Sequence, residues 1–89
     1  MSYPFLHVTN VRYLDGYRLV VSFTDGTERE VDLSDALEGE VFEPLRDEAM
    51  FASAYVDPET RTVSWSNGAD FAPEFLRQIS LEVAPADAR

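Results

Sequence analysis

Two Asp-Gly pairs, Asp15-Gly16 and Asp25-Gly26, divide the first third of the chain into three short segments. Each segment alternates apolar and polar residues and is rich in Val, Leu, Tyr and Phe. Asp-Gly is frequent in the tight turns of antiparallel hairpins, and a period of two is typical of a strand with one buried face. The pattern predicts a three-stranded antiparallel meander.

The length of each turn decides which side chains share a face of this sheet. Two-residue turns would mix apolar and charged side chains in the same rows. Three-residue loops over residues 14–16 and 24–26, with each Gly in the left-handed conformation, align Val11, Leu19 and Val31 in one apolar row. We therefore expect the register that three-residue loops impose.

In this register the outer face of the meander carries a cross-strand pair of Arg18 and Asp32, which would contribute about 0.2–1 kcal/mol. Two valines also fall on this face. Isolated exposed valines are ordinary, and the alternatives are a contact surface or a position beneath the C-terminal tail. The candidate interaction surface on this face consists of Val8, Arg12, Arg18 and Val20.

Shorter elements follow the meander. Residues 34–38, before Gly39, predict one helical turn, and Asp47 is placed to cap a helix over residues 48–54. Residues 55–56 and 62–66 predict a second hairpin, in which Val63 and Trp65 alternate with polar residues and leave one face wet. Asp70 is expected to cap a last helix through residue 79, with an inner face made of Phe71, Phe75, Leu76 and Ile79.

The predicted order is therefore β-β-β-α-β-β-α, an α+β domain in which the helices cover one face of an antiparallel sheet. With 89 residues the chain has room for one small domain. We expect this domain over residues 1–81, followed by a flexible C-terminal tail over residues 82–89.

The chain is strongly acidic and contains neither lysine nor cysteine. Its 17 Asp and Glu residues outnumber 7 Arg residues, and the net charge is −10. This charge repels phosphate backbones and anionic membranes, so neither nucleic acid nor membrane is expected as a direct partner. The absence of cysteine excludes disulfides, thiolate metal sites and cysteine nucleophiles. No export signal or long apolar run is recognisable, and we expect a cytoplasmic location.

The acidic, lysine-free composition has two explanations: a GC-rich genome that encodes its basic residues as Arg, or halophilic adaptation. In the second, dense like charges oppose compaction in dilute buffer and are screened as salt is added. Halophilic adaptation predicts a melting temperature that rises between millimolar and molar NaCl, measured by circular dichroism. A melting temperature that is the same across this range would contradict it.

Three motifs together resemble a known family. They are the strand from Tyr17 to Phe23 with its Asp-Gly turn, the sequence Val41-Phe-Glu-Pro-Leu-Arg-Asp47, and Trp65-Ser-Asn-Gly-Ala-Asp70. In this order and spacing the chain resembles the bacterial domain-of-unknown-function family 2442, from about Val8 to Ile79. The resemblance implies a small α+β domain without an established activity. It also implies that some relatives lie beside another small gene, in what look like toxin and antitoxin units, and that others carry a helix-turn-helix region, which we expect this chain to lack.

No catalytic motif is recognisable. His7 is the only histidine, so a structural or solvated role is favoured over a triad or a metal site. No nucleophile elbow, phosphate loop or calcium loop occurs, and the acids between residues 32 and 43 suit a solvated rim as well as a cation site. We therefore expect no enzyme activity, no catalytic residue, no cofactor and no metal.

The leading hypothesis is a non-catalytic protein-interaction module, the regulatory or antitoxin-like partner in a two-gene unit, whose acidic surface complements a basic protein encoded nearby. One alternative is a small ligand-binding domain or enzyme. Its pocket would combine an aromatic wall with polar turn groups, using Phe42, Trp65, Asn67 and Asp70. Against it, Trp65 suits a core, Asn67 a turn and Asp70 a helix cap. Another alternative is a self-associating structural protein, a homo-oligomer formed through the outer sheet face or an open strand edge.

Overall fold

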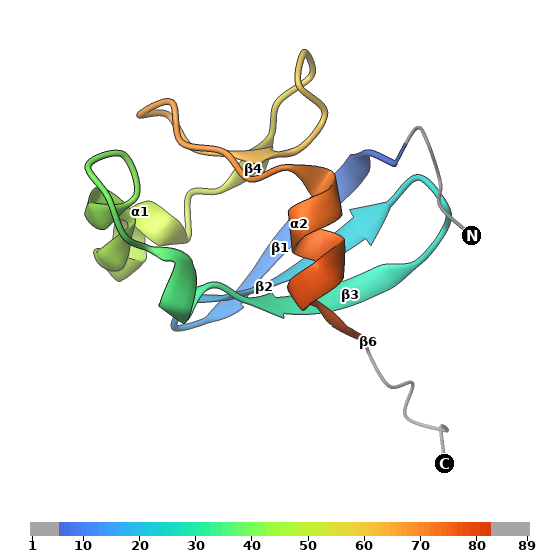
Figure 1. The fold of residues 1–89 in the computed structure, drawn as a ribbon, viewed down its shortest axis with the longest axis horizontal. Coiled ribbons are helices and arrows are strands. Elements are labelled where there is room, and N and C mark those ends of the chain that lie inside the picture. The colour runs from blue at the N-terminus through green and yellow to red at the C-terminus, as the bar shows by residue number, and fades with distance from the viewer. Residues whose placement is uncertain (1–5, 83–89) are drawn as a thin grey trace.

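The computed structural model describes residues 6–82. Its main layer is a four-stranded antiparallel sheet in the order β1-β2-β3-β6 (Figure 1). The strands are β1 (Val8–Asp15), β2 (Arg18–Phe23), β3 (Glu28–Asp32) and β6 (Leu81–Glu82). A second, two-stranded sheet consists of β4 (Tyr55–Val56) and β5 (Val63–Ser64). The predicted meander and second hairpin are both confirmed.

The helical elements are short. Two 3₁₀ turns, η1 (Ser34–Ala36) and η2 (Glu43–Arg46), precede α1 (Glu48–Phe51), and α2 (Pro73–Ile79) follows the second hairpin. Figure 1 shows α2 lying across the sheet, and α1 beside the end of the sheet where β1 turns into β2. The predicted α+β order is confirmed. With seven residues, α2 is the longest helix within residues 6–82, and none of the helices there could cross a membrane.

The β1–β2 turn differs from the prediction. It has two residues, Gly16 and Tyr17, and the register shifts beside Thr9 and Leu14. As a result, Val11 lies opposite Val21 and not opposite Leu19. Because this displacement is two residues, and successive side chains alternate between faces, the apolar row still faces inward.

The β2–β3 turn has the predicted register. Leu19 lies opposite Val31 and Arg18 opposite Asp32, and the Phe23 amide donates to the Thr27 carbonyl at 2.9 Å. Gly26 has a φ of 88°, a left-handed conformation that glycine adopts without the steric cost of a Cβ atom. The three-residue loop over residues 24–26 is confirmed.

The core lies between the sheet, the second hairpin and the helices, and Trp65 is its largest fully buried side chain, at 1% exposure. Its Nε1–H donates to the Phe51 carbonyl at 2.9 Å. The Trp65 ring centroid lies 5.7 Å from that of Phe51 and 5.8 Å from that of Phe71. The hydrogen bond matters because a buried indole N–H without a partner is costly.

Both faces of β5 are buried, so the predicted wet face is wrong. Thr62 and Ser64 are buried because the segment leading into α2 pairs along the other side of β5, through a bridge between Ser64 and Asp70. The Thr62 hydroxyl donates to the Phe71 carbonyl, and the Ser64 hydroxyl donates to the Thr62 carbonyl. Local hydrogen bonds therefore satisfy these two side chains inside the protein.

One predicted helix cap is confirmed and another is wrong. The Asp47 carboxylate accepts from the Ala49 amide at 3.0 Å and caps α1, although α1 ends at Phe51 and not at residue 54. Asp70 does not cap α2. The N-cap is Ala72, without a side-chain hydrogen bond, because the bridge to β5 holds Asp70 outside the first turn and Pro73 begins the helix.

The predicted C-terminal tail over residues 82–89 lies outside the described residues, apart from Glu82. The backbone of Glu82 belongs to β6, in which it lies opposite Arg29.

Candidate interaction surface

The outer face of the sheet, predicted as an interaction surface, carries three of the four residues assigned to it. The predicted place of Val8 on this outer face is wrong. The register shift beside Thr9 turns the Val8 side chain inward, where it is 3% exposed and packs in the core. Val20 does lie outside the core cluster, opposite Arg12 and Glu30, but it is only 4% exposed. Neither valine therefore offers apolar contact area.

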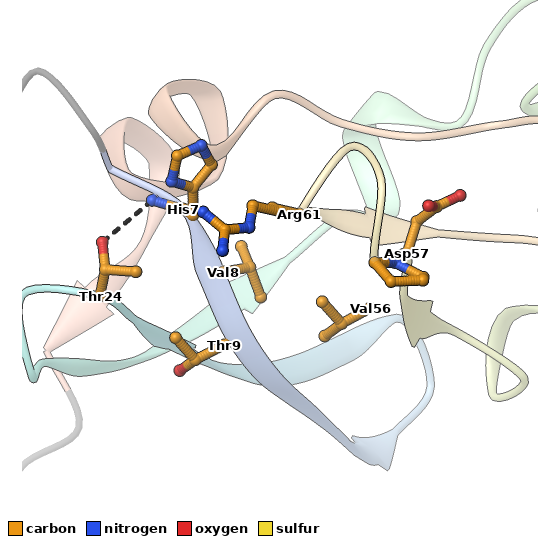
Figure 2. A pocket seen from close by; sticks show the side chains of 8 residues that line it. His7, Val8, Thr9, Thr24, Val56, Asp57 and Arg61 are labelled. Atoms are coloured by element: carbon orange, nitrogen blue, oxygen red, sulfur yellow. Dashed lines mark hydrogen bonds between the residues drawn. The ribbon is translucent and has the colours of Figure 1, made fainter.

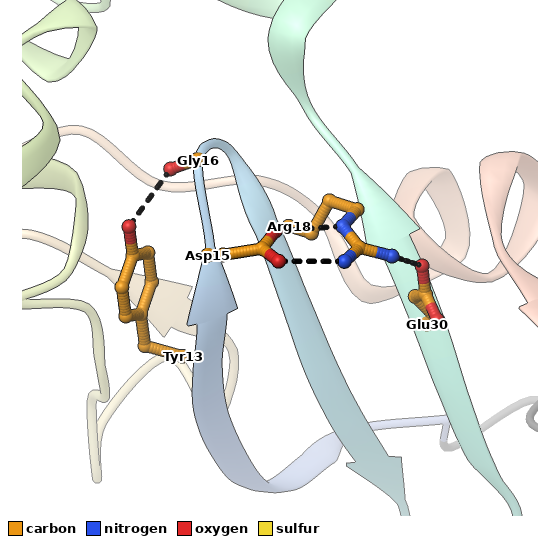
Figure 3. A network of polar contacts seen from close by, with 5 residues as sticks. All are labelled: Tyr13, Asp15, Gly16, Arg18 and Glu30. Carbon is orange, nitrogen blue, oxygen red and sulfur yellow. Dashed lines mark hydrogen bonds and ion pairs between the residues drawn. The ribbon is translucent and has the colours of Figure 1, made fainter.

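The charge on this face is largely satisfied within the chain. Arg18 donates to both oxygens of Asp15 at 2.8 Å, and its Nη1 donates to Glu30 Oε2 at 2.6 Å (Figure 3). Hydrogen bonds from Arg18 hold the pKa of Asp15 below its usual value. Arg12 is exposed and has no ion pair within residues 6–82.

The predicted cross-strand placement of Arg18 opposite Asp32 is confirmed, but the ion pairs of Arg18 are with Asp15 and Glu30 and not with Asp32. Asp32 Oδ1 accepts from the Ser34 amide at 2.9 Å, and hydrogen bonds from Ser34 lower the pKa of Asp32. The carboxylate therefore serves the turn into η1, where its short side chain satisfies a free backbone amide.

The residues of the alternative pocket have mainly structural contacts. The Trp65 ring is buried, and Phe42 is half-buried and stacked on Phe71. Asn67 Oδ1 accepts from the Ala69 amide at 3.1 Å, and Nδ2 donates to the Val41 carbonyl at 2.9 Å. Asp70 is exposed. Trp65 therefore presents no open wall to a ligand, and both ends of the Asn67 amide are engaged.

An apolar patch that the sequence did not reveal lies beside this corner. The Phe42 and Phe71 ring centroids are 4.7 Å apart with planes at 25°, and those of Phe71 and Phe75 are 5.5 Å apart at 16°. Phe75 is 37% exposed, which corrects its predicted place on the inner face of α2, and Val41 is 47% exposed. We call Val41, Phe42, Phe71 and Phe75 the aromatic patch.

The feature of the sequence that could have indicated this patch is a pair of adjacent apolar residues in the predicted helix. Phe75 and Leu76 are neighbours in α2, and successive helical residues point in directions about 100° apart. Leu76 is completely buried, so Phe75 turns toward the surface and stacks on Phe71. The bond from Asn67 to the Val41 carbonyl brings the irregular segment before η2 to the same place.

Exposed carboxylates lie close in the sequence to the aromatic patch, in both of the segments that contribute residues to it. None of them has an ion pair within residues 6–82, and together we call them the acidic rim: Glu38, Glu40, Glu43, Asp70 and Glu74. Two bases are equally near in the sequence: Arg46, whose Nε donates to the Leu37 carbonyl at 2.9 Å, and Arg77, which pairs with Asp25 at 2.8 Å. The rim therefore keeps its negative charge available to a partner.

The described residues, 6–82, contain no group of three or more His, Asp or Glu side chains arranged to hold a metal ion.

The family model described as "Protein of unknown function (DUF2442)" matches residues 8–81 of the chain. No curated protein matches the chain, and no solved structure does.

Proposed function

The chain belongs to the DUF2442 family of proteins of unknown function, and from its surface we propose a non-catalytic protein-interaction module that binds a basic protein. The observation that carries the proposal is the aromatic patch together with the exposed, unpaired carboxylates of the acidic rim, which are close to it in the sequence. The proposal includes a regulatory or antitoxin-like role toward a partner encoded nearby, and it excludes nucleic acid as a direct ligand.

Burial of the aromatic patch would supply the free energy of binding. Apolar patches bordered by polar residues are typical of interaction sites, and aromatic residues are enriched in the buried centres of interfaces. Val41 and Phe75 still expose large apolar side chains, while Phe42 and Phe71 are already held in place by stacking. Such a preorganised surface loses little conformational entropy when a partner covers it.

The acidic rim defines the chemistry of the partner. Carboxylates around an apolar centre attract a surface with Lys or Arg around an apolar anchor, and they repel phosphate groups. The chain contains an internal example of this recognition. The Arg77 guanidinium lies 5.2 Å from the Phe23 ring centroid and forms a 2.8 Å ion pair with Asp25. The exposed Phe75 ring and the carboxylates of the rim offer the same two kinds of group to an external arginine.

Titration calorimetry with the product of the adjacent gene tests the proposal. We expect a complex at moderate salt whose affinity falls as salt rises. The double variant Glu40→Lys/Glu43→Lys should weaken binding by about tenfold or more, because each reversed charge in the rim repels a basic partner. Phe75→Ser should weaken it by a similar factor, because a hot-spot truncation costs more than about 1 kcal/mol.

Glu28→Lys is the matched control, because Glu28 is an exposed acid on the outer face of the sheet. Its charge change has the same sign as that of the rim variant and half the size, but Glu28 lies outside the rim, so Glu28→Lys should retain most of the affinity. If no complex forms, or if Glu28→Lys weakens binding as much as the rim variant, the proposed surface is wrong.

Self-association through the patch would bring two acidic rims together, so light scattering at two concentrations should give the mass of a monomer.

A further inference from the structure

A cavity of about 380 Å³ opens where the start of β1 meets the turn between β4 and β5 (Figure 2). None of its lining residues belongs to the aromatic patch or the acidic rim. Its volume lies in the range of small-molecule sites. Its lining includes the apolar residues Val56 and Pro58 and the polar residues His7, Thr9 and Arg61, whereas Val8, which also borders it, is only 3% exposed. The cavity therefore combines an apolar wall with hydrogen-bond donors.

Arg61, which lines this cavity, has an unusual backbone conformation. Its φ is 60°, and it is the only residue other than glycine with a positive φ within residues 6–82. A side chain makes this conformation unfavourable, and glycine is the usual residue there. Two hydrogen bonds hold the backbone: the Arg61 amide donates to the Asp57 carbonyl at 2.7 Å, and the Val8 amide donates to the Arg61 carbonyl at 2.9 Å.

The guanidinium of Arg61 has no ion pair or side-chain hydrogen bond within the part of the chain that the structure describes. Arg18 and Arg77, by contrast, both pair with carboxylates. Figure 2 shows the Arg61 guanidinium directed toward His7. The hairpin thus holds an unneutralised cation at the cavity, beside the His7 imidazole.

Asp57, the acid that lines the cavity, is occupied elsewhere. Its Oδ1 accepts from the Glu59 amide at 2.7 Å and from the Thr60 amide at 3.4 Å, which stabilises the turn. In Figure 2 its carboxylate points away from Arg61 and His7. Asp57 therefore leaves the charge of the guanidinium available to a ligand.

We propose that this cavity binds a carboxylate that carries a short apolar group. The carboxylate would accept from the Arg61 guanidinium, whose planar donors match its two oxygens, and from the His7 imidazole beside it. The apolar group would contact Val56 and Pro58. A single negative charge suits the site better than a phosphate dianion, because the whole chain already carries a charge of −10. The ligand is either a free acid or the carboxyl terminus of a peptide.

Titrations of the full chain, followed by ¹⁵N NMR, test this proposal with three probes: 3-methylbutanoate, the uncharged 3-methylbutanamide, and N-acetylglycyl-valine. We expect the first or the third to shift the amides of His7, Thr9 and Val56 with saturation in the millimolar range. The amide should cause no such shifts. Tighter binding of the peptide identifies a chain terminus as the ligand, and tighter binding of 3-methylbutanoate identifies a free acid. If neither carboxylate binds, or if the amide binds as tightly, the proposal is wrong.

Arg61→Gly separates binding from folding. Glycine relieves the left-handed backbone, so this variant should melt at a higher temperature than the natural chain, while its affinity for the carboxylate falls by about tenfold or more. Arg12→Gln removes an exposed arginine from the outer face of the sheet and should leave the affinity unchanged. An unchanged affinity in Arg61→Gly would overturn the proposal. So would a loss of affinity accompanied by a lower melting temperature, because it would show that Arg61 acts through the fold.

Discussion

Replacing Trp65 with alanine should lower the free energy of unfolding by about 3–5 kcal/mol, the usual cost of removing a large buried aromatic side chain. The variant loses ring contacts with Phe51 and Phe71 and the hydrogen bond to the Phe51 carbonyl. A small domain has a free energy of unfolding near the lower end of about 5–15 kcal/mol, so much of the variant should be unfolded in dilute buffer. Urea denaturation followed by far-UV circular dichroism measures the loss, because Trp65 is the only tryptophan and its fluorescence disappears with it.

Two controls isolate the parts of this effect. Trp65→Phe retains a ring but removes one of the two donors to the Phe51 carbonyl, which still accepts from the Ala54 amide at 3.2 Å, so the lost hydrogen bond should cost about 0.5–1.5 kcal/mol. Tyr55→Ala removes an aromatic residue that is 42% exposed and should cost less than about 1 kcal/mol. A Trp65→Ala variant with the same urea midpoint as the natural chain would show that the Trp65 ring is not part of the core.

The inward and outward faces of the meander could be predicted although the register of β1 and β2 could not. The predicted and observed registers differ by two residues, which is one full period of a strand, so Val11 and Leu19 face inward in both. The shift beside Thr9 depends on a distant contact. The Val8 amide donates to the carbonyl of Arg61, on the second hairpin, and no local pattern announces that bond.

The helix α2 shows why capping residues alone did not place an element. Asp70 is a good capping residue in isolation, but its backbone pairs with Ser64 two residues before the helix begins. Pro73 then begins the helix without a side-chain cap. Tertiary pairing of β5 with the following segment thus outweighed a local preference of about 1 kcal/mol.

The candidate site in the structure also differs from the predicted pocket because of tertiary contacts. Trp65, Asn67 and Asp70 carry polar groups that could line a pocket, yet the fold uses the side chains of Trp65 and Asn67 for internal hydrogen bonds. The exposed apolar area beside this corner lies on Val41 and Phe75, and the sequence pattern predicts Phe75 on the inner face of α2. These side chains are exposed because a short helix and an irregular segment cannot bury all of their apolar residues. Which of them are buried depends on how the elements pack against one another.

The stability of the protein should also fall steeply in acid because of Asp25, in the β2–β3 loop. Asp25 Oδ1 accepts from the Thr27 hydroxyl at 2.6 Å and the Thr27 amide at 3.0 Å, and Oδ2 pairs with Arg77 of α2 at 2.8 Å. The Thr27 hydroxyl, together with the Thr27 amide and Arg77, lowers the pKa of Asp25 to about 2. Since the folded pKa is depressed, the contribution is complete above the unfolded pKa near 4 and is lost as pH falls through about 2.

Asp25→Asn measures that contribution directly. At pH near 6 it should lower the free energy of unfolding by about 1.5–3 kcal/mol, because a charged acceptor with three partners is replaced by a neutral one. Urea midpoints between pH 6 and pH 2 should fall less steeply for the variant than for the natural chain. Asp35→Asn, at an exposed acid with no partner within residues 6–82, should keep the natural slope. Equal slopes in Asp25→Asn and the natural chain would mean that the acid sensitivity arises at other carboxylates, and that the link from the β2–β3 loop to α2 contributes little.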